Sequence, residues 1–124
     1  MDSIVFNKSE DFALRIIKLR EYLVKKKKED VISKQIIRSG TGIGANLAES
    51  VHGASDSDFI HKLSISQKEC AETLYWLRLL KRAGFITEKQ FGSIYDDCVE
   101  IAKLLTSIIK TMKTKQKRLI TNNL

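Results

Sequence analysis

The sequence predicts an all-α protein, an antiparallel up-and-down four-helix bundle. The 124-residue chain contains no proline, and three of its six glycines fall within residues 40–44. Its apolar residues recur at the spacings of three and four that place them on one face of a helix. Many short strands would need more turn residues than this chain has. With 124 residues and 43% apolar content, the chain has the size of a single domain with one core.

The first helix is predicted over residues 9–28. Ser9 is a favourable N-cap, and the two acidic residues that follow it place negative charge in the first turn. The apolar face consists of Phe12, Ile16, Leu19 and Leu23, supported by Ala13, Ile17 and Val24.

The second helix is predicted over residues 31–52, with Gly40, Gly42 and Gly44 inside it. Each glycine costs a helix about 1 kcal/mol relative to alanine, so these three imply either a break or a packing reason for having no side chain. Gly40, Gly44 and Ala48 share one face, and we therefore expect another helix to approach closely there.

The third helix is predicted over residues 57–83, because capping residues precede it and Gly84 follows it. The fourth is predicted over residues 88–113, opened by the capping box Thr87-x-x-Gln90 and followed by a basic tail over residues 114–124. The two apolar stripes consist of Phe59, Leu63, Ser66, Cys70, Thr73, Leu77 and Leu80 in the third helix and of Phe91, Ile94, Cys98, Ile101, Leu105, Ile108 and Met112 in the fourth.

Surplus apolar residues predict association with other copies of the chain. From Leu74 to Leu80 the sequence reads Leu-Tyr-Trp-Leu-Arg-Leu-Leu, and at 100° per residue these side chains point all around the helix. One core cannot hold them all, and such surplus marks a contact with another chain. The predicted oligomer interface consists of Leu74, Tyr75, Trp76 and Leu79.

Uneven positive charge predicts a polyanionic partner. The chain carries 22 Lys and Arg against 15 Asp and Glu, a formal net charge of +7. Two runs concentrate this charge, and no acidic residue follows Glu100. The candidate nucleic-acid-binding residues are Lys25, Lys26, Lys27 and Lys28 in the first run and Lys110, Lys113, Lys115, Lys117 and Arg118 in the second. The alternative is that the charge serves solubility.

Polar residues among apolar ones predict a structural polar network of Arg38, Asn46, Glu49 and Glu72. About 16 Å of helix separates Arg38 from Glu49, so they cannot pair directly and need partners on other helices or another subunit. The alternative is a ligand or nucleic-acid contact.

Other motifs do not point to catalysis. The glycine-rich segment Ser39–Ala45 lacks the lysine and hydroxyl of a phosphate-binding loop and has no strand before it. Cys70 and Cys98 lack metal-site spacing and lie in apolar stripes, and no carboxylate is matched with a base and a nucleophile. No segment is long and apolar enough to cross a membrane. We therefore expect a cytoplasmic protein that is not an enzyme, with no metal and no cofactor.

Several segments together resemble the bacterial four-helix-bundle family encoded in intervening sequences of large-subunit (23S) ribosomal RNA genes. They are Arg38–Ser50, Asp58–Ile65, Glu72-Thr73-Leu74-Tyr75-Trp76-Leu77-Arg78-Leu79-Leu80 and Gly84-Phe85-Ile86. The resemblance covers nearly the whole domain, although the family more often has Ala, Val or Pro at the three glycines of the second helix.

The resemblance implies a bundle that assembles into a homo-oligomeric ring, a pentamer, without known enzymatic activity. The chain also looks like a distant relative of the accessory protein of diversity-generating retroelements, a basic bundle ring that binds nucleic acid and a reverse transcriptase. We therefore expect an oligomeric scaffold that binds RNA or DNA backbone through basic surfaces, with a reverse transcriptase or another protein as a further partner. The alternative is a structural or protein-interaction bundle without a nucleic-acid ligand.

Overall fold

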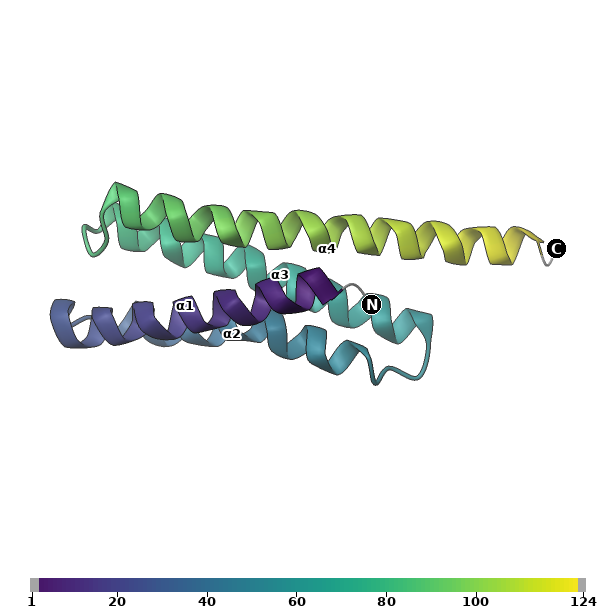
Figure 1. Cartoon of the computed structure of the whole chain (residues 1–124), viewed down its shortest axis with the longest axis horizontal. Coiled ribbons are helices and arrows are strands. Elements are labelled where there is room, and N and C mark those ends of the chain that lie inside the picture. The colour runs from purple at the N-terminus through teal and green to yellow at the C-terminus, as the bar shows by residue number, and fades with distance from the viewer. Residues whose placement is uncertain (1–2, 123–124) are drawn as a thin grey trace.

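The computed structural model describes residues 3–122, which form four α-helices and no β-strand. The helices are α1 (Ser3–Lys27), α2 (Val31–Ser50), α3 (Asp56–Arg82) and α4 (Glu88–Asn122). Successive helices run in opposite directions, and α4 projects past the others at its C-terminal end (Figure 1). Each helix packs on its neighbour in the chain, and α1 also contacts α4. The all-helical prediction is therefore confirmed.

The core is formed by the stripes that the sequence predicts, with small shifts. In α3 the buried stripe matches the prediction except that Ile60 is buried and Phe59 only partly so. In α4 the stripe moves at its end, where Ile109 is buried and Ile108 only partly. An alternating spacing of three and four drifts around a straight helix of 3.6 residues per turn, so the buried face shifts along a long helix.

The start of α1 differs from the prediction. The helix begins at Ser3, and Ser9, which was expected to cap it, is buried at 1% exposure inside it. Val5, Ser9, Phe12 and Ile16 share the buried face, so the apolar pattern starts earlier than residue 9. The Ser9 hydroxyl donates to the Phe6 carbonyl at 2.8 Å, which satisfies it within its own helix.

The C-terminal end of α4 also differs, because the predicted tail over residues 114–124 continues the helix to Asn122. The last two residues of that tail lie outside the described part of the chain. Extending a formed helix needs no new nucleus, and the segment contains neither glycine nor proline. The Thr114 and Thr121 hydroxyls donate to the carbonyls one turn earlier, at 2.9 and 3.0 Å.

The capping signals predicted for both ends of α3 and for the start of α4 are confirmed by their hydrogen bonds. The Ser55 hydroxyl accepts from the Asp58 amide at the start of α3. Gly84 has a φ of +85° after α3, and the next amide, that of Phe85, donates to the Leu80 carbonyl at 2.9 Å. At α4, the Gln90 amide donates to the Thr87 hydroxyl at 3.1 Å and the Thr87 amide donates to the Gln90 side chain at 2.8 Å.

The glycines of α2 allow close helix packing and do not break the helix, which is continuous from Val31 to Ser50. A Cβ atom on Gly40 would lie 2.8 and 2.9 Å from the two γ carbons of Ile16 in α1. A Cβ atom on Gly44 would lie 3.2 Å from the Ser9 hydroxyl. The packing interpretation is thus confirmed for these two glycines, whereas Ala48 is exposed.

Small hydroxyl side chains join α2 to α3 on the opposite side of α2. The Thr73 hydroxyl lies 2.9 Å from the Ser39 hydroxyl and 2.8 Å from the Glu69 carbonyl. The Ser66 hydroxyl donates to the Ile43 carbonyl at 2.9 Å. All three hydroxyl groups belong to fully buried residues, so these bonds are shielded from water.

We predict that Gly40→Ala destabilises the protein. Ile16 is β-branched and buried, so it cannot move away from the new methyl group, and overpacking of this kind costs about 1–3 kcal/mol against a gain of about 1 kcal/mol in helix propensity. The free energy of unfolding in urea, measured at one protein concentration, is expected to fall by up to about 2 kcal/mol.

Gly92→Ala in α4 is the matched control, since a Cβ atom there meets nothing within 4 Å. This variant is expected to be more stable than the unmodified protein by about 0.5–1 kcal/mol. Equal stabilisation by both substitutions would show that α1 and α2 are not held at this close distance.

Candidate nucleic-acid interface

The first basic cluster, Lys25–Lys28, lies where α1 ends and all four side chains are exposed. Positive charge is favourable there because it faces the negative end of the helix dipole. The adjacent Glu29 does not neutralise the cluster from the surface. Its carboxylate is turned inward at 7% residue exposure and accepts from the backbone amides of Ile32 and Ser33 at the start of α2.

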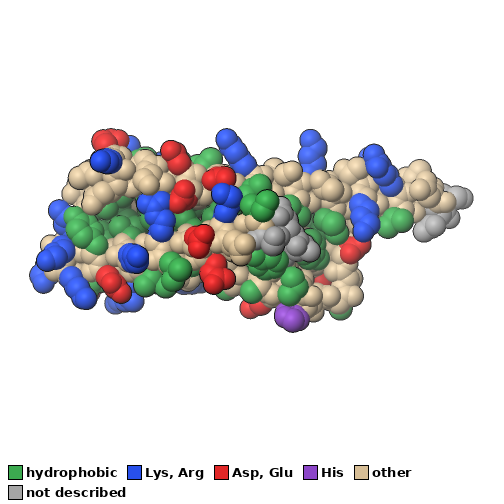
Figure 2. All heavy atoms as spheres, in the orientation of Figure 1, with side chains coloured by type: hydrophobic (Ala, Val, Ile, Leu, Met, Phe, Trp, Pro, Cys, Tyr) green, Lys and Arg blue, Asp and Glu red, His purple; other side chains and the backbone are tan. Residues whose placement is uncertain are grey.

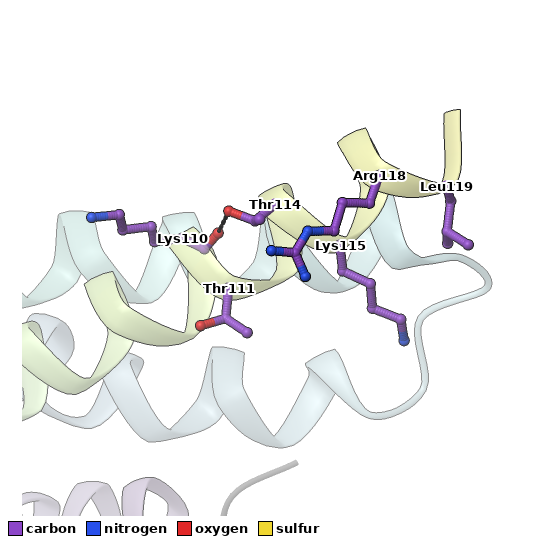
Figure 3. A pocket seen from close by; sticks show the side chains of 6 residues that line it. All are labelled: Lys110, Thr111, Thr114, Lys115, Arg118 and Leu119. Carbon is purple, nitrogen blue, oxygen red and sulfur yellow. Dashed lines mark hydrogen bonds between the residues drawn. The ribbon is translucent and has the colours of Figure 1, made fainter. Parts of the chain in front are cut away.

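The second basic cluster is Lys110, Lys113, Lys115, Lys117 and Arg118, all exposed on the last third of α4. Figure 3 shows Lys110 and Lys115 extending in different directions and Arg118 reaching back along the helix, around a shallow hollow lined also by Thr111 and Leu119. The opposite side of the helix faces the bundle, where Ile109 is buried and the Gln116 amide lies 3.4 Å from the Ser57 hydroxyl. A rigid helix therefore presents these cations to solvent.

The two clusters lie at opposite ends of the molecule. Because successive helices are antiparallel, α1 and α3 end where α2 and α4 begin, and the first cluster belongs to that end. The second cluster lies on the part of α4 that projects at the other end (Figure 1). Figure 2 shows one face of the molecule, with Lys and Arg side chains at both of its ends and several Asp and Glu side chains between them.

Ion pairs between α1 and α4 occupy the region between the clusters. Arg15 bonds the Asp97 carboxylate at 2.5 Å, and Lys8 lies 2.8 Å from the Glu100 carboxylate. The hydrogen bond with Glu100 and its negative charge raise the pKa of Lys8 above its ordinary value. These cations are already paired, unlike the nine of the two clusters, which form no ion pair with any residue of the described range 3–122.

The four residues of the predicted polar network are not joined within one chain. Asn46 donates to the Gly42 carbonyl at 2.9 Å, Glu49 pairs with Lys62 at 2.6 Å, and Glu72 accepts from the Trp76 indole at 3.3 Å. Arg38 is exposed. Asn46 and Glu72 bond within their own helices, whereas Glu49 pairs with a residue of α3, one of the other helices where a partner was expected.

The residue beside this group that sequence reasoning missed is Glu69. Its carboxylate packs over Gly42, since a Cβ atom on that glycine would lie 3.0 Å from Oε2. Burial and the negative charge of Glu72 raise the pKa of Glu69, and the positive charge of Arg38 acts in the opposite direction. The i, i+3 spacing of the two glutamates was visible in the sequence, but the position of Gly42 beneath Glu69 was not.

The predicted interface residues occupy different environments. Leu74 and Trp76 are partly buried against the core, Leu79 is half-buried, and of the four only Tyr75, at 45% exposure, is exposed. Leu77 and Leu80, the other leucines of the run, are fully buried. The bundle therefore absorbs more of this run than the all-round helical pattern indicates.

A second apolar surface lies in the groove between α1 and α2, which sequence reasoning did not identify. Ile17 and Val24, expected on the buried face of α1, are 41% and 38% exposed. They line one part of the groove with Ile37 and Thr41 of α2, and the charged residues Arg20, Glu21 and Lys25 of α1 border it. The groove continues between Phe6, Ser9, Glu10 and Ala13 of α1 and the small residues Gly44, Ala45 and Ala48 of α2. The side chains of Ile17 and Val24 point away from the core because α1 is turned toward α2 by its close contact at Gly40.

Chemically reactive groups are sparse. Within residues 3–122 no three His, Cys, Asp or Glu side chains come together as metal ligands would. Cys70 and Cys98 are both buried and unoxidised, and the Cys98 thiol lies 3.7 Å from the Cys70 carbonyl. Its hydrogen bonding to Cys70 and its burial raise the pKa of Cys98, which disfavours the nucleophilic thiolate. None of the described helices has an apolar stretch that could span a bilayer.

Comparison with known proteins identifies relatives of the fold. The chain matches the family described as 23S rRNA-intervening sequence protein over residues 1–107. It is also similar to a crystal structure of a protein of unknown function from the S23 ribosomal protein family of Bacteroides thetaiotaomicron VPI-5482. That likeness has 55% sequence identity and a TM-score of 0.85, and it covers 86% of this chain and 98% of the other. No curated protein matches the chain.

The end of the family match divides the two basic clusters. Lys25–Lys28 lies inside residues 1–107, whereas Lys110 to Arg118 lies beyond them. The second cluster therefore lies outside the part of the chain that matches the family.

The raised pKa of Glu69 predicts that Glu69→Gln raises the melting temperature at pH 7. An acid whose pKa is higher in the folded state binds its proton more strongly there, so the ionised side chain opposes folding above that pKa. As the pH falls below the ordinary value of 4.5, the wild-type carboxyl is protonated in both states and the advantage of the variant is expected to disappear. Melting curves at pH 7 and pH 4 check this.

Asp96→Asn, at an exposed residue of α4, is the control for the loss of one negative charge. An equal melting-temperature gain for both variants at pH 7, or a gain for Glu69→Gln that persists at pH 4, would contradict the role given to burial and Glu72.

Proposed function

We propose that this chain, which belongs to the 23S rRNA-intervening sequence protein family, is a non-enzymatic homo-oligomeric scaffold that binds the backbone of RNA or DNA through its basic ends. The observation that carries the proposal is the second cluster, where five exposed cations follow one another on a projecting helix. Lysines that only stabilise the fold or keep the protein soluble do not need to be concentrated on one segment.

Backbone contacts fit these side chains better than base recognition does. Lysine is a flexible point charge, and phosphate contacts supply affinity with little sequence information. Aromatic rings that could stack on bases are mostly committed elsewhere. Trp76 is half-buried and donates to Glu72, and Phe91 lies beneath the Lys81 ammonium at 4.5 Å from its ring centroid. We therefore expect binding with little sequence selectivity.

Replacing Lys110, Lys113, Lys115, Lys117 and Arg118 with Gln is expected to weaken binding and to flatten its salt dependence. Each phosphate contact on duplex DNA contributes about 0.9 to the slope of log K against log salt concentration, so losing five contacts lowers the slope by up to about 4.5. Fluorescence anisotropy with a labelled duplex, at salt concentrations from about 50 to about 200 mM, measures the affinity and the slope. Affinity and slope unchanged from the unmodified protein would exclude this cluster.

The homo-oligomer is proposed because apolar surface remains uncovered in one chain. The groove between α1 and α2 exposes Ile17 and Val24 along much of its length, and its small residues leave room for a helix of a second copy. Full burial of such a side chain is worth about 1.5–3 kcal/mol, so covering the part that remains exposed, 41% of Ile17 and 38% of Val24, contributes about 0.6–1.2 kcal/mol each. A ring, with five copies as the family resemblance implies, would cover the groove of every subunit.

Ile17→Lys combined with Val24→Lys is expected to raise the dissociation constant of the oligomer by about tenfold or more, since each 1.4 kcal/mol corresponds to a factor of about ten. Light scattering over a dilution series reports the mass. Val51→Lys, at a residue that is 53% exposed outside the groove, is the control. A monomer for the unmodified protein at micromolar concentration would refute the oligomer itself, and an unchanged mass for the double variant would place the interface elsewhere.

The second candidate function is a protein-interaction bundle without a nucleic-acid ligand, and the same apolar groove favours it. Its occupant would then be a different protein. Purification from cells with and without nuclease separates the two functions, because nucleic acid should be retained in the untreated sample only if the basic clusters bind it.

A further inference from the structure

The positions of the two basic clusters raise the question whether they bind one nucleic-acid segment or two. The first turn of α4 lies at the end of α1, where Ile86, Gln90 and Ile94 share a groove with Leu19 and Tyr22. From Glu88 to Lys110, α4 rises about 33 Å at 1.5 Å per residue, so this distance separates the clusters along the bundle. The Debye length at physiological salt is about 8 Å. Each cluster therefore attracts phosphates independently.

Acidic residues make the path between the clusters unfavourable for a single duplex. Along the outer side of α4, Asp96 and Glu100 are exposed, and Asp97 lies beside them. On α1, Asp11 is exposed and lines a shallow hollow with Asp97 and Glu100 of α4. A straight duplex laid along α1 and α4 from one cluster to the other would bring its phosphates against these carboxylates, which repel it.

Two cations of this region, Lys8 and Arg15, are engaged with Glu100 and Asp97. Lys18 and Lys103 are exposed there as well, but each stands singly, so the concentrated positive charge is at the two ends. A phosphate backbone is therefore best accommodated across each end, with a separate segment at the other.

We infer that the protein bridges two nucleic-acid segments, with Lys25–Lys28 holding one and the cluster from Lys110 to Arg118 holding the other. This inference rests on the proposed nucleic-acid binding. It adds an activity that binding alone does not require, namely joining two duplexes in one complex. Because the second cluster lies beyond residues 1–107 of the family match, truncated relatives without such an extension should bind without bridging in this way.

Bridging is tested by immobilising one duplex on beads and measuring capture of a second, fluorescent duplex of unrelated sequence. Three variants each reverse three charges: Lys25, Lys26 and Lys28 to Glu at one end, Lys110, Lys113 and Lys117 to Glu at the other, and Lys18, Lys68 and Lys103 to Glu between the ends. All nine residues are exposed, so the third variant is a control of equal net charge. Circular dichroism melting confirms that each variant is folded.

The unmodified protein is expected to capture the second duplex, and the control variant to retain most of that capture. Each single-end variant should still bind one duplex in solution but lose capture by about tenfold or more, because each end holds its own segment. Capture by either single-end variant at the level of the control would overturn the inference. So would an unmodified protein that binds a duplex without capturing a second.

Failure of the proposed function gives a different result. If the unmodified protein binds neither duplex in solution, nucleic-acid binding itself is wrong and bridging fails with it.

Discussion

The close contact of α2 with both α1 and α3 is the constraint on which the rest of the structure depends. Gly40 lets the branched side chain of Ile16 lie directly against the α2 backbone, and on the other side the hydroxyls of Ser39 and Thr73 meet at 2.9 Å. Larger residues at these positions would separate the helices. Because α1 is drawn toward α2, its contact with α4 is the least extensive of the four and includes the ion pair of Arg15 with Asp97.

This arrangement determines where apolar and charged side chains remain available. Turning α1 toward α2 leaves Ile17 and Val24 along an open groove, which suits a second copy of the chain. The acids of the α1–α4 contact are concentrated midway along the bundle, whereas the unpaired cations of Lys25–Lys28 and the projecting end of α4 lie beyond it. Assembly would therefore use the side of the bundle and nucleic-acid binding its ends, and the two surfaces meet at Lys25, which lines the groove beside Val24.

Local signals allowed much of the fold to be predicted from the sequence. The Thr87–Gln90 box and the stripe through Leu63 and Leu77 depend on neighbours within one helix, and both have the expected hydrogen bonds or burial. Apart from the close helix approach at Gly40 and Gly44, interactions between helices could not be predicted. Ser9 was predicted to cap the first helix because its burial could not be seen in the sequence. That burial depends on the packing of α1 near Gly44. The four residues of the predicted polar network do not bond to one another, because Asn46 and Glu72 bond within their own helices and Glu49 pairs with Lys62 of α3. The basic clusters were visible in the sequence, but their placement at opposite ends required the topology.

The central claim, that the positive charge at the two ends binds phosphate backbone, is tested most directly by lysine footprinting. Acetylation of each lysine by an amine-reactive ester would be measured by mass spectrometry with and without bound duplex. We expect protection at Lys25–Lys28 and at Lys110, Lys113, Lys115 and Lys117, with Lys68 and Lys103 labelled equally in both samples. Equal protection of all exposed lysines, or none at either end under conditions where the duplex is bound, would contradict the claim.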